Sequence, residues 1–412
     1  MRATTLLRRT TNLKDTRFTR VRFNKEGIVA EVAPAWRSAR CPGCGVQRPG
    51  YDRRPSRQWR HLDMAGMKLV LEYNPRRVDC KKCGVVVEQV PWASAGSRHT
   101  RPFEDMIGYL AQRCDKTTIA NMMRIAWATV GSIIERVVAR HGLKDRLADL
   151  VYIGVDEISY RRHHNYLTVV IDHFRGEVVW AHPGKSADTL KAFFDELGEE
   201  RCGQIEAVTV DLAGGYIKAI TEASPAAKLI FDRFHIQRLA HDALDEVRRD
   251  EVRQAEESGD RSSLKKTRWA LQKNPWNLTR FESEKLAELQ RSNKRLYRAY
   301  LLKEALVGVL DRRQVNVARR KLKEWLAWAG RSRLAPFKKL ARTIRSRMEG
   351  ILEYVRYGCL SNGRSEGINR KIRTITTRSY GFHGAASLIA MITLCCSGII
   401  LQPVHVYPGV AA

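Results

Sequence analysis

Short runs of apolar and β-branched residues, separated by polar turns, fill the middle of the chain between positions 150 and 231. Runs of this kind predict strands, whereas two intervening segments repeat their apolar residues at helical spacing. The predicted elements are three strands, a helix, a strand, a helix and a strand, at residues 150–155, 166–171, 177–181, 186–197, 207–210, 215–222 and 228–231 in turn. The order βββαβαβ predicts a mixed sheet with helices on its faces.

The regions on either side have different patterns. Before the predicted sheet, residues 18–32 and 68–73 predict strands and residues 97–146 predict helices. After it, residues 233–350 are predicted to be nearly all helical and are dense in Lys and Arg. A loop at 358–364 is expected to lead into a final helical stretch. These changes of pattern predict several domains, as does the length of 412 residues.

The longest apolar stretch, 385–401, is interrupted by Ser, Thr and Gly residues. It is marginal for a membrane span of about 20 residues and predicts a buried C-terminal helix instead. Residues 1–20 are basic and lack a long apolar core, so no secretory signal is predicted. With no such signal, the odd number of nine cysteines argues against a disulfide scaffold and fits a reducing cytoplasm.

The net charge changes the functional expectation. The chain has 73 Lys and Arg residues against 44 Asp and Glu, which gives a charge of +29 and a pI of about 10.1. Such a surplus repels itself unless a polyanion is near, and nucleic acid is the leading partner. A structural role like that of a ribosomal protein and binding to an anionic membrane are the alternatives.

Two cysteine pairs have metal-ligand spacing. Cys41 and Cys44 form one C-x-x-C pair, Cys80 and Cys83 form the other, and residues 45–79 separate them. Four thiolates on two tight turns complete the closed tetrahedral site of structural zinc. The long gap predicts an inserted hairpin. Two unrelated pairs, or redox dithiols, are the alternatives.

Other possible ligands are less convincing. His61 lies in the gap between the pairs, but with four cysteines available a surface or packing role is expected for it. The remaining cysteines lack ligand spacing and are predicted to be small core residues: Cys114, Cys202, Cys359, Cys395 and Cys396.

Residues 117–124 and 127–136 predict two short helices with a tight join. The second has an apolar face, and Thr129, Ser132 and Arg136 are the candidates for DNA contact on its other side. An ordinary helical linker would share this pattern. The position beside a zinc module in a strongly basic chain favours a helix-turn-helix.

Three carboxylates form the candidate catalytic set. Asp156 and Asp211 end the predicted first and fourth strands, and Glu366 starts a predicted helix. In an RNase H-like fold these two strands are adjacent and a later helix supplies the third acid. Hard oxygen ligands suit Mg²⁺ or Mn²⁺, and two such ions would activate water or a 3′-hydroxyl. The alternative is that each acid caps a helix or pairs with an arginine.

Three further residues lie near this set. Asp232 ends the predicted fifth strand and is an auxiliary candidate. His235 follows it and either contacts a phosphate, assists proton transfer or is a hydrogen-bonded core residue. Glu157 is expected to point away from Asp156, because side chains alternate along a strand.

Several sequence blocks, in this order, resemble the ISL3 family of bacterial insertion-sequence transposases. The resemblance covers nearly the whole chain, although the tail after Gln402 lacks an obvious counterpart. It rests on the two cysteine pairs, the helix-turn-helix segment, and the blocks at 155–159, 166–170, 210–216, 232–236, 274–279, 362–369 and 380–382.

The resemblance implies a DDE transposase that binds terminal inverted repeats and uses Mg²⁺. Asp156, Asp211 and Glu366 match the catalytic acids of the family. The four paired cysteines match its zinc knuckles. The separation of the last two acids fits a helical insertion between them.

Basic and aromatic residues around this framework carry further predictions. Asn362 and Arg364 are expected to orient Glu366 or touch phosphate, and Asn369 lies near Glu366 on the predicted helix. Arg370 and Arg373 are candidates for a phosphate clamp, with a solvated basic face as the alternative. The helical region either binds DNA or builds a dimer, but most of its tryptophans are expected to be core residues: Trp269, Trp276, Trp325 and Trp328.

The expected architecture is multidomain. An N-terminal arm (1–38) precedes a zinc-ribbon-like module (39–93) and an all-α helix-turn-helix DNA-binding domain (97–146). An α/β RNase H-like catalytic domain (150–400) follows, with a large all-helical insertion at about 240–350.

The working hypothesis is a cytoplasmic, nucleoid-associated transposase that contains structural Zn²⁺ and uses catalytic Mg²⁺ or Mn²⁺. It would bind double-stranded DNA at transposon ends and at the target, as a homodimer or higher oligomer, without a membrane partner. Two rival hypotheses are a non-catalytic DNA-binding regulator and a nuclease without strand transfer.

Overall fold

The chain folds into two units, which are described one at a time: Met1–Leu143 with Ala386–Ala412, and Lys144–Ala385. The structure is a computed structural model. It describes residues 2–142, 145–161, 165–212, 214–257, 264, 267–358, 363–379, 382 and 384–403.

A four-stranded sheet organises the N-terminal part of the first unit, and helix α1 (Ala3–Thr10) packs beside it. Its inward side chains alternate along each strand and form a core around Trp59, Leu69, Leu71 and Trp92. In the sheet order β1-β2-β7-β6, the strands are Thr16–Asn24, Gly27–Pro34, Met67–Tyr73 and Arg57–Met64. The antiparallel β6–β7 hairpin is the inserted hairpin that the long gap between the cysteine pairs predicts.

Short strands hold the cysteine pairs. β3 pairs with β4, and β8 lies between β5 and β9. The five strands are Ala39–Arg40, Gln47–Arg48, Gly50–Arg53, Arg76–Cys80 and Gly84–Val87.

The remainder of the first unit is helical. Gln112, at the end of α2, donates hydrogen bonds of 2.8 Å to the carbonyls of Leu394 and Ile399, which fixes the C-terminal segment beside α2. The predicted C-terminal helix is therefore packed inside a globular unit, and no helix in the described ranges is both long enough and apolar enough for a membrane span. The helices are α2 (Arg101–Ala111), α3 (Lys116–Met123), α4 (Trp127–His141) and α16 (Ala385–Cys396).

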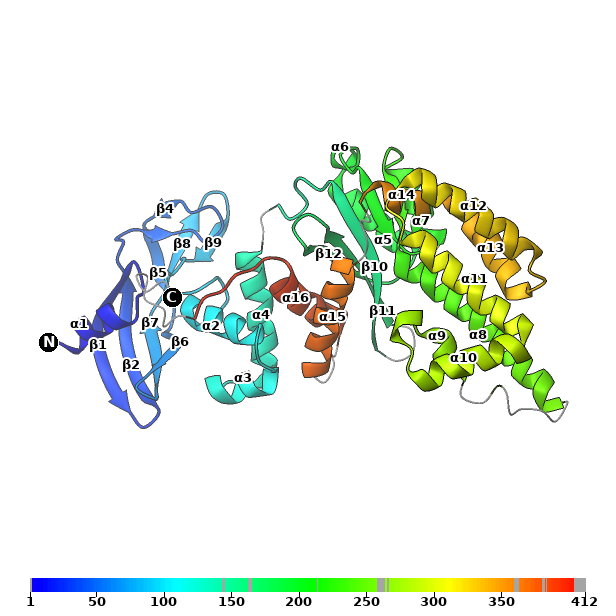
Figure 1. Cartoon of the computed structure of the whole chain (residues 1–412). Helices are drawn as coiled ribbons and strands as arrows, with labels where there is room; N and C mark the ends of the chain where they lie inside the picture. The colour runs from blue at the N-terminus through cyan, green and yellow to red at the C-terminus, as the bar shows by residue number, and fades with distance from the viewer. Residues whose placement is uncertain are drawn as a thin grey trace. The chain divides into compact units, whose positions relative to one another are not determined.

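The second unit contains a five-stranded sheet in the order β12-β11-β10-β13-β14 (Figure 1). β10, β13 and β14 are parallel to one another, whereas β11 and β12 form antiparallel pairs. The first and fourth strands of the sheet are therefore neighbours. In sequence order the strands are Tyr152–Arg161, Asn165–Asp172, Glu177–Pro183, Ala207–Val210 and Lys228–Phe231.

Helices cover both faces of this sheet. Alternate residues such as Val155 and Val210 pack with Phe193 in the core on the α5 and α7 side. On the other face, Ile230 packs against Leu352 of α14, and α15 contacts β10. The helices are α5 (Ala187–Leu197), α6 (Glu199–Cys202), α7 (Gly214–Ala223), α14 (Met348–Arg356) and α15 (Gly363–Arg378).

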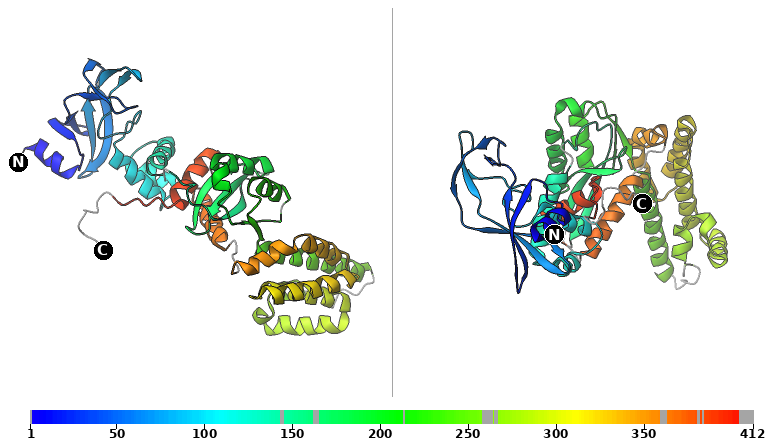
Figure 2. Two further views of the ribbon diagram at one scale, coloured as in Figure 1. Left: turned by 90° about the horizontal axis from the view of Figure 1, so that it is seen from above. Right: turned by 90° about the vertical axis from the view of Figure 1, so that its left-hand side faces the viewer.

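Between β14 and α14 the described chain is helical. Helices α8, α11, α12 and α13 lie side by side, as both views in Figure 2 show. Trp325 of α12 is buried between them and donates a 2.8 Å hydrogen bond to the carbonyl of Leu302. The elements are α8 (Arg233–Glu257), α9 (Thr267–Gln272), η2 (Pro275–Asn277), α10 (Arg280–Ser292), α11 (Lys294–Leu310), α12 (Val315–Arg331) and α13 (Ala335–Ser346).

The tryptophans of this region differ from the expectation. Trp325 is a core residue, as predicted, with 2% exposure. Trp269 and Trp276 are 60% and 72% exposed and Trp328 is 37% exposed, so the core prediction is wrong for them. The helices pack through leucine, alanine and phenylalanine side chains instead.

Candidate functional site

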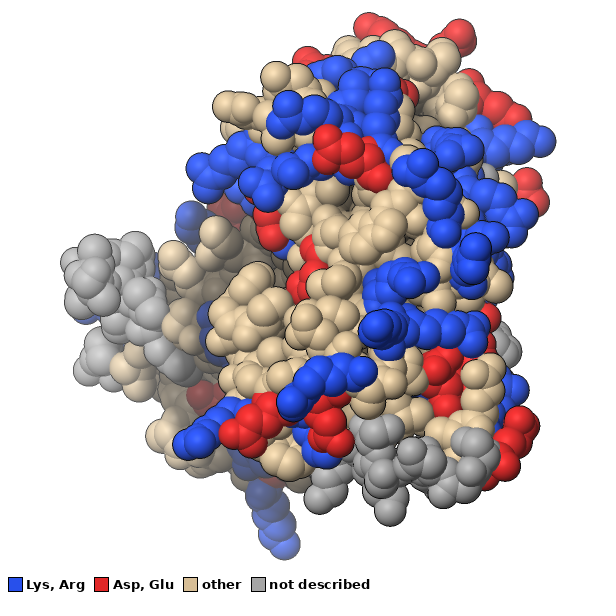
Figure 3. All heavy atoms as spheres, turned by 45° about the vertical axis from the view of Figure 1, so that its right-hand side comes forward, with Lys and Arg blue, Asp and Glu red and all other residues tan. Residues whose placement is uncertain are grey.

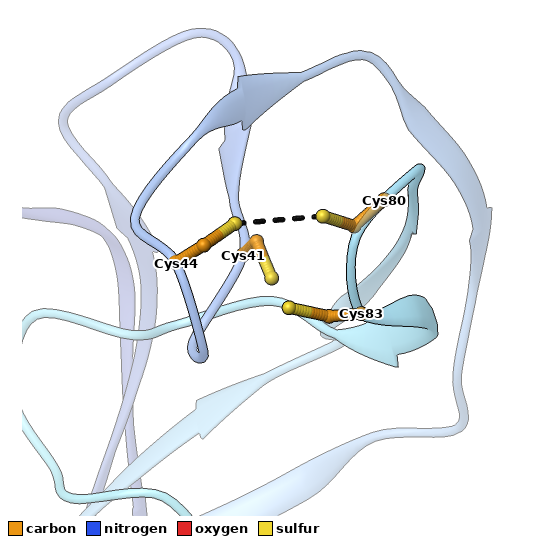
Figure 4. A group of neighbouring side chains, drawn as sticks. All are labelled: Cys41, Cys44, Cys80 and Cys83. Carbon is orange, nitrogen blue, oxygen red and sulfur yellow. Dashed lines mark hydrogen bonds between the residues drawn. The ribbon is translucent and has the colours of Figure 1, made fainter.

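The two cysteine pairs converge at one point in the first unit. The four sulfur atoms of Cys41, Cys44, Cys80 and Cys83 all lie within 4.8 Å of one another, and those of Cys44 and Cys80 are 3.5 Å apart (Figure 4). Gly45 and Gly84, which follow the two pairs, have φ angles of +73° and +74°. Glycine adopts this left-handed conformation without steric cost, which lets each chain turn tightly below its thiols.

The chemistry of this cluster fits a zinc ion. The backbone N–H of Cys44 stabilises a thiolate and lowers the pKa of Cys41 to about 7. The pKa of Cys83 is instead raised to about 12, first through the side chain of Cys41. Four thiols packed this closely cannot all ionise unless a cation neutralises them, and zinc does so in tetrahedral thiolate sites.

His61 is not part of this cluster. It is buried, and its Nδ1 lies 2.8 Å from the hydroxyl of Thr100. Burial, with the nearby charge of Arg60, lowers the pKa of His61 to about 4. The expected packing role is confirmed.

Of the remaining cysteines, Cys202 and Cys396 are buried, whereas Cys114 and Cys395 are partly exposed. Cys359 lies outside the described residues.

In the second unit, Asp156 lies in β10 and Asp211 directly follows the neighbouring parallel strand β13. Gly154 of β10 pairs with Thr209 of β13, and each aspartate lies two residues beyond its member of that pair. Because side chains alternate along strands, both carboxylates lie on the same face as Gly154 and Thr209. The prediction that Asp156 ends its strand is wrong, since β10 continues to Arg161 through pairing with β11. Asp156 instead lies just past the point where pairing with β13 stops.

Asp156 is held by a residue from α15. The side-chain amide of Asn369 donates a hydrogen bond to Asp156 Oδ2, and the backbone N–H of Glu157 donates one of 2.7 Å to Oδ1. Burial raises the pKa of Asp156, with a further contribution from Asp211. Two adjacent carboxylates with restricted solvation are a suitable donor set for a hard divalent cation.

Asp232 and His235 lie next to Asp211. β14 pairs in parallel with β13, and Asp232 follows its last residue. His235 lies between two aspartates, with Nδ1 2.5 Å from Asp211 Oδ1 and Nε2 3.7 Å from Asp232 Oδ2. Burial raises the pKa of Asp232 to about 6. Burial opposes protonation of His235, but the nearby carboxylates, Asp211 first among them, raise its pKa overall.

Glu157 points to the opposite face, as the strand alternation predicts. The hydroxyl of Tyr216, a buried residue of α7, is hydrogen-bonded to it. Burial raises the pKa of Glu157.

Helix α15 approaches β10 closely at Gly154. A β-carbon at this position would lie 2.8 Å from both Ser365 Oγ and His173 Nε2. His173 is itself buried and lies 2.6 Å from the hydroxyl of Thr209. The side chains of Ser365, His173 and Thr209 therefore pack around Gly154, where the start of α15 lies over the strand that carries Asp156.

Arg364 also anchors this helix. Its guanidinium donates hydrogen bonds to the backbone carbonyls of His173 and Phe174, the second at 3.0 Å. Arg364 therefore holds α15 against the segment that follows β11, a role that the sequence pattern did not predict. Asn362 lies outside the described residues.

Glu366 is exposed in the first turn of α15. The predicted loop at 358–364 is two residues too long at its end, because α15 begins at Gly363. Arg370 and Arg373 are exposed on the same helix, one and two turns further on. Among the described residues, only the four cysteines form a group of three or more potential metal ligands whose ligand atoms all lie within 4.8 Å of one another. The structure therefore brings Asp156 and Asp211 together, and places Glu366 on the helix that supplies Asn369.

In the first unit, α3 and α4 are joined tightly through Arg124, which adopts a left-handed conformation at φ 54°. Val130 and Ile133 of α4 are fully buried, as the predicted apolar face requires. Ser132 is exposed on the other side. Thr129 lines a groove of about 960 Å³ whose walls include several basic residues: Arg57, Arg60 and Arg98.

Arg136 has a different environment from the one expected. Its Nε donates a 2.6 Å hydrogen bond to the fully buried Glu104 of α2, which also binds Arg140 at 2.8 Å. Arg136 therefore ties α4 to α2, which stabilises the helical module from within.

The contacts that organise the carboxylates were not predictable from the sequence pattern. It indicated Asn369 only as a neighbour of Glu366, and it did not indicate Ser365 or His173. The signal available was the short spacing in the Ser365–Asn369 segment, which puts both polar residues on one side of a helix next to buried Ile368.

Three family models match the chain. The zinc-finger of transposase IS204/IS1001/IS1096/IS1165 matches residues 37–83, and the helix-turn-helix domain of transposase family ISL3 matches residues 88–138. An ISL3 model described as a transposase, of the DDE type, matches residues 153–392, which is more than half of the chain.

Individual relatives agree with these matches. The chain is 40% identical over 398 residues to the transposase for insertion sequence element IS1557 of two Mycobacterium tuberculosis strains, with 90% of this chain and 89% of each relative covered. It is 28% identical over 345 residues to the transposase for insertion sequence element IS1001 of Bordetella parapertussis, covering 83% and 85%.

Proposed function

Because the chain belongs to the ISL3 family of transposases, a DNA-binding enzyme family, we propose that it cuts DNA at the terminal inverted repeats of its own insertion sequence and joins the ends to a target. The observation that supports this proposal most directly is that Asp156, which Asn369 of α15 contacts, lies close to Asp211 at the end of the neighbouring parallel strand. The strand order β12-β11-β10-β13-β14 agrees with an RNase H-like catalytic domain, into which α8 to α13 are inserted.

Asp156, Asp211 and Glu366 are the residues proposed to hold Mg²⁺ or Mn²⁺. When bound, such ions supply Lewis-acid stabilisation of the attacking and leaving oxygens of a phosphodiester. Asn369 orients the Asp156 carboxylate, and His235 holds Asp211 from the other side. Glu366, which is exposed in the first turn of α15, would be the third ligand.

His235 is the candidate residue for proton transfer. Burial lowers its pKa, but the neighbouring carboxylates, Asp211 first among them, raise the pKa overall and so favour the protonated form. A protonated imidazole beside Asp232 and Asp211 is suited to contact a phosphate oxygen or to donate a proton to the leaving 3′-oxygen, which then becomes the 3′-hydroxyl.

DNA recognition is assigned to the first unit. Zinc on the four cysteines would hold the β-rich module rigid, and the groove lined by Thr129 presents basic walls to a phosphate backbone. We assign end recognition to α4 and to this groove. The protein is proposed to act as a dimer or larger assembly that holds two ends.

The test is cleavage and strand transfer on duplexes that carry the element's own ends, with Mg²⁺ or Mn²⁺. Asp211→Asn is compared with wild type and with Asp195→Asn, which alters an exposed aspartate of α5. Joined products from wild type and Asp195→Asn, absent for Asp211→Asn with end binding intact, support the proposal. An end-binding wild type without metal-dependent cleavage contradicts it in favour of a regulator, and nicking without joining favours a nuclease.

A further inference from the structure

The α12–α13 hairpin carries a disproportionate share of the positive charge. Between Arg312 and Arg347 the sequence has thirteen Lys and Arg residues and one acidic residue, Glu324. This short segment therefore supplies +12 of the net +29. Figure 3 shows a face of the molecule on which Lys and Arg side chains gather and Asp and Glu side chains are fewer.

Helix α13 separates its charged and apolar residues cleanly. Phe337, Leu340 and Ile344 are buried against the neighbouring helices. The exposed side has four basic residues at spacings of one, three and four positions, which form one stripe on a helix: Lys338, Lys339, Arg342 and Arg345.

Helix α12 repeats this arrangement with an aromatic residue at the border of the stripe. Leu322 and Trp325 are buried, whereas Arg320, Lys323 and Arg331 are exposed. Trp328 lies three positions before Arg331, at the border between the exposed and buried sides of the helix, and is 37% exposed. The exposed side of α12 is therefore basic, like that of α13.

Few of these charges are balanced within the protein. Arg319 pairs with Glu349 at 2.8 Å, and Arg320 lies 4.0 Å from the exposed Glu324. Over the described part of the chain, no carboxylate lies within 4.0 Å of the other basic side chains in this hairpin. Arginines elsewhere in the helical region do have acidic partners, as in the pairs Arg238–Asp242, Arg253–Asp250 and Arg280–Glu284.

We infer that the outer face of the α12–α13 hairpin binds duplex DNA through its phosphate backbone, as a site separate from the helix-turn-helix. Unbalanced, exposed cations in a row gain most from an anionic polymer, because their binding releases condensed counterions. This surface offers rows of cations and no pattern for reading bases, so its binding is expected to be independent of sequence. The inference rests on the proposed function only in taking DNA as the partner.

The test measures the affinity of the full-length, zinc-loaded protein for a duplex of random sequence, without added Mg²⁺ or Mn²⁺ and without a chelator, across a series of salt concentrations. The triple variant Lys338→Gln/Arg342→Gln/Arg345→Gln is compared with Arg238→Gln/Arg253→Gln/Arg280→Gln, which removes three charges that have acidic partners. The α13 variant should bind about tenfold more weakly or worse. The slope of log affinity against log salt is negative, and this variant should reduce its magnitude by about 2.7, since each phosphate that is no longer neutralised removes about 0.9. The control variant should change the slope by less than about 1.

Equal slopes for wild type and the α13 variant overturn the inference. It is also overturned if that variant changes only the sedimentation of the protein, or only its binding to vesicles with anionic lipid. Since all three positions are exposed, circular dichroism and the unfolding midpoint should match wild type. Arg342→Glu alone provides a second measure, with a larger slope change than Arg342→Gln. Because the binding assay contains no Mg²⁺ or Mn²⁺, failure of cleavage by wild type in the separate cleavage assay would contradict the proposed function and leave this result unaffected.

Discussion

Asn369 donates a hydrogen bond from its side-chain amide to the carboxylate of Asp156, across 213 positions of sequence. The contact joins α15 to the central strand of the sheet at the point where Asp211 lies alongside. It fixes one carboxylate of the proposed metal site while Glu366 lies one turn earlier on the same helix. Asn369 is therefore a positioning residue for Asp156.

Replacing Asn369 by alanine should lower metal-dependent cleavage by about 10- to 100-fold, as loss of an outer-sphere partner of a metal ligand does. Asn369→Asp should be more damaging at low metal concentration, because it adds a negative charge beside the already crowded Asp156. Cleavage is measured against Mg²⁺ concentration, with end binding in the absence of added Mg²⁺ as the control. Unchanged metal dependence in both variants would contradict the positioning role.

The close approach at Gly154 makes a second prediction. A β-carbon there meets Ser365 and His173 at 2.8 Å, so Gly154→Ala should lower the free energy of unfolding by about 1–3 kcal/mol. Gly308→Ala is the matched control, because its β-carbon has no neighbour within 4 Å in the interior of α11. That change should stabilise the protein by up to about 1 kcal/mol. Urea unfolding measures both, and equal effects would show that α15 does not pack as described.

Much of the sheet was predictable from local pattern. The bounds 207–210 and 228–231 agree with β13 and β14, because these strands are short, apolar and flanked by polar residues. β10 extends beyond its apolar run, since pairing with β11 carries polar residues after Asp156 into the ladder. Pairing with a partner strand depends on tertiary structure, which a local pattern does not contain.

The candidate site was predictable as a set of residue types and less so as a geometry. Adjacent first and fourth strands place Asp156 and Asp211 together, as expected. The Asn369 contact, the anchoring of α15 by Arg364 and the partnership of Arg136 with Glu104 all join residues far apart in sequence. Each depends on how helices dock, and helical periodicity specifies only which side of a helix faces inward.

Zinc should be required by the first unit. Wild type should bind one zinc ion per chain, and Cys83→Ser should lower this to less than about half, since structural zinc supplies much of the folding free energy of small modules. Cys114→Ser is the control, because Cys114 lies outside the cluster. Metal analysis and thermal unfolding with and without a chelator test this. Full zinc content in Cys83→Ser would contradict the four-cysteine site.

Buried His173 should make the second unit sensitive to acid. Burial, with the nearby charge of Arg364, lowers its pKa from 6.5 to about 4 in the folded state. Between these values the unfolded chain binds the additional proton, so the free energy of unfolding falls as pH falls, by roughly 3 kcal/mol at pH 4. His173→Gln should reduce this slope, whereas His182→Gln, at an exposed position, should not. Urea unfolding at pH 7.5, 6 and 5 would show parallel curves for wild type and His173→Gln if the assignment is wrong.

Arg364 and Arg373 lie on the same helix and should behave differently when neutralised. Arg364 donates to the backbone carbonyls of His173 and Phe174, so Arg364→Gln should lower the free energy of unfolding by about 1 kcal/mol while the salt slope of DNA binding stays constant. Arg373 is exposed, and if it clamps a phosphate, Arg373→Gln should lower that slope by about 0.9 with a stability change within about 0.5 kcal/mol. Measuring stability and salt dependence on the same two proteins separates the roles, because an anchor changes the first and a phosphate contact changes the second. A lower slope for Arg364→Gln, with stability retained, would show that this arginine leaves its carbonyl partners to bind DNA.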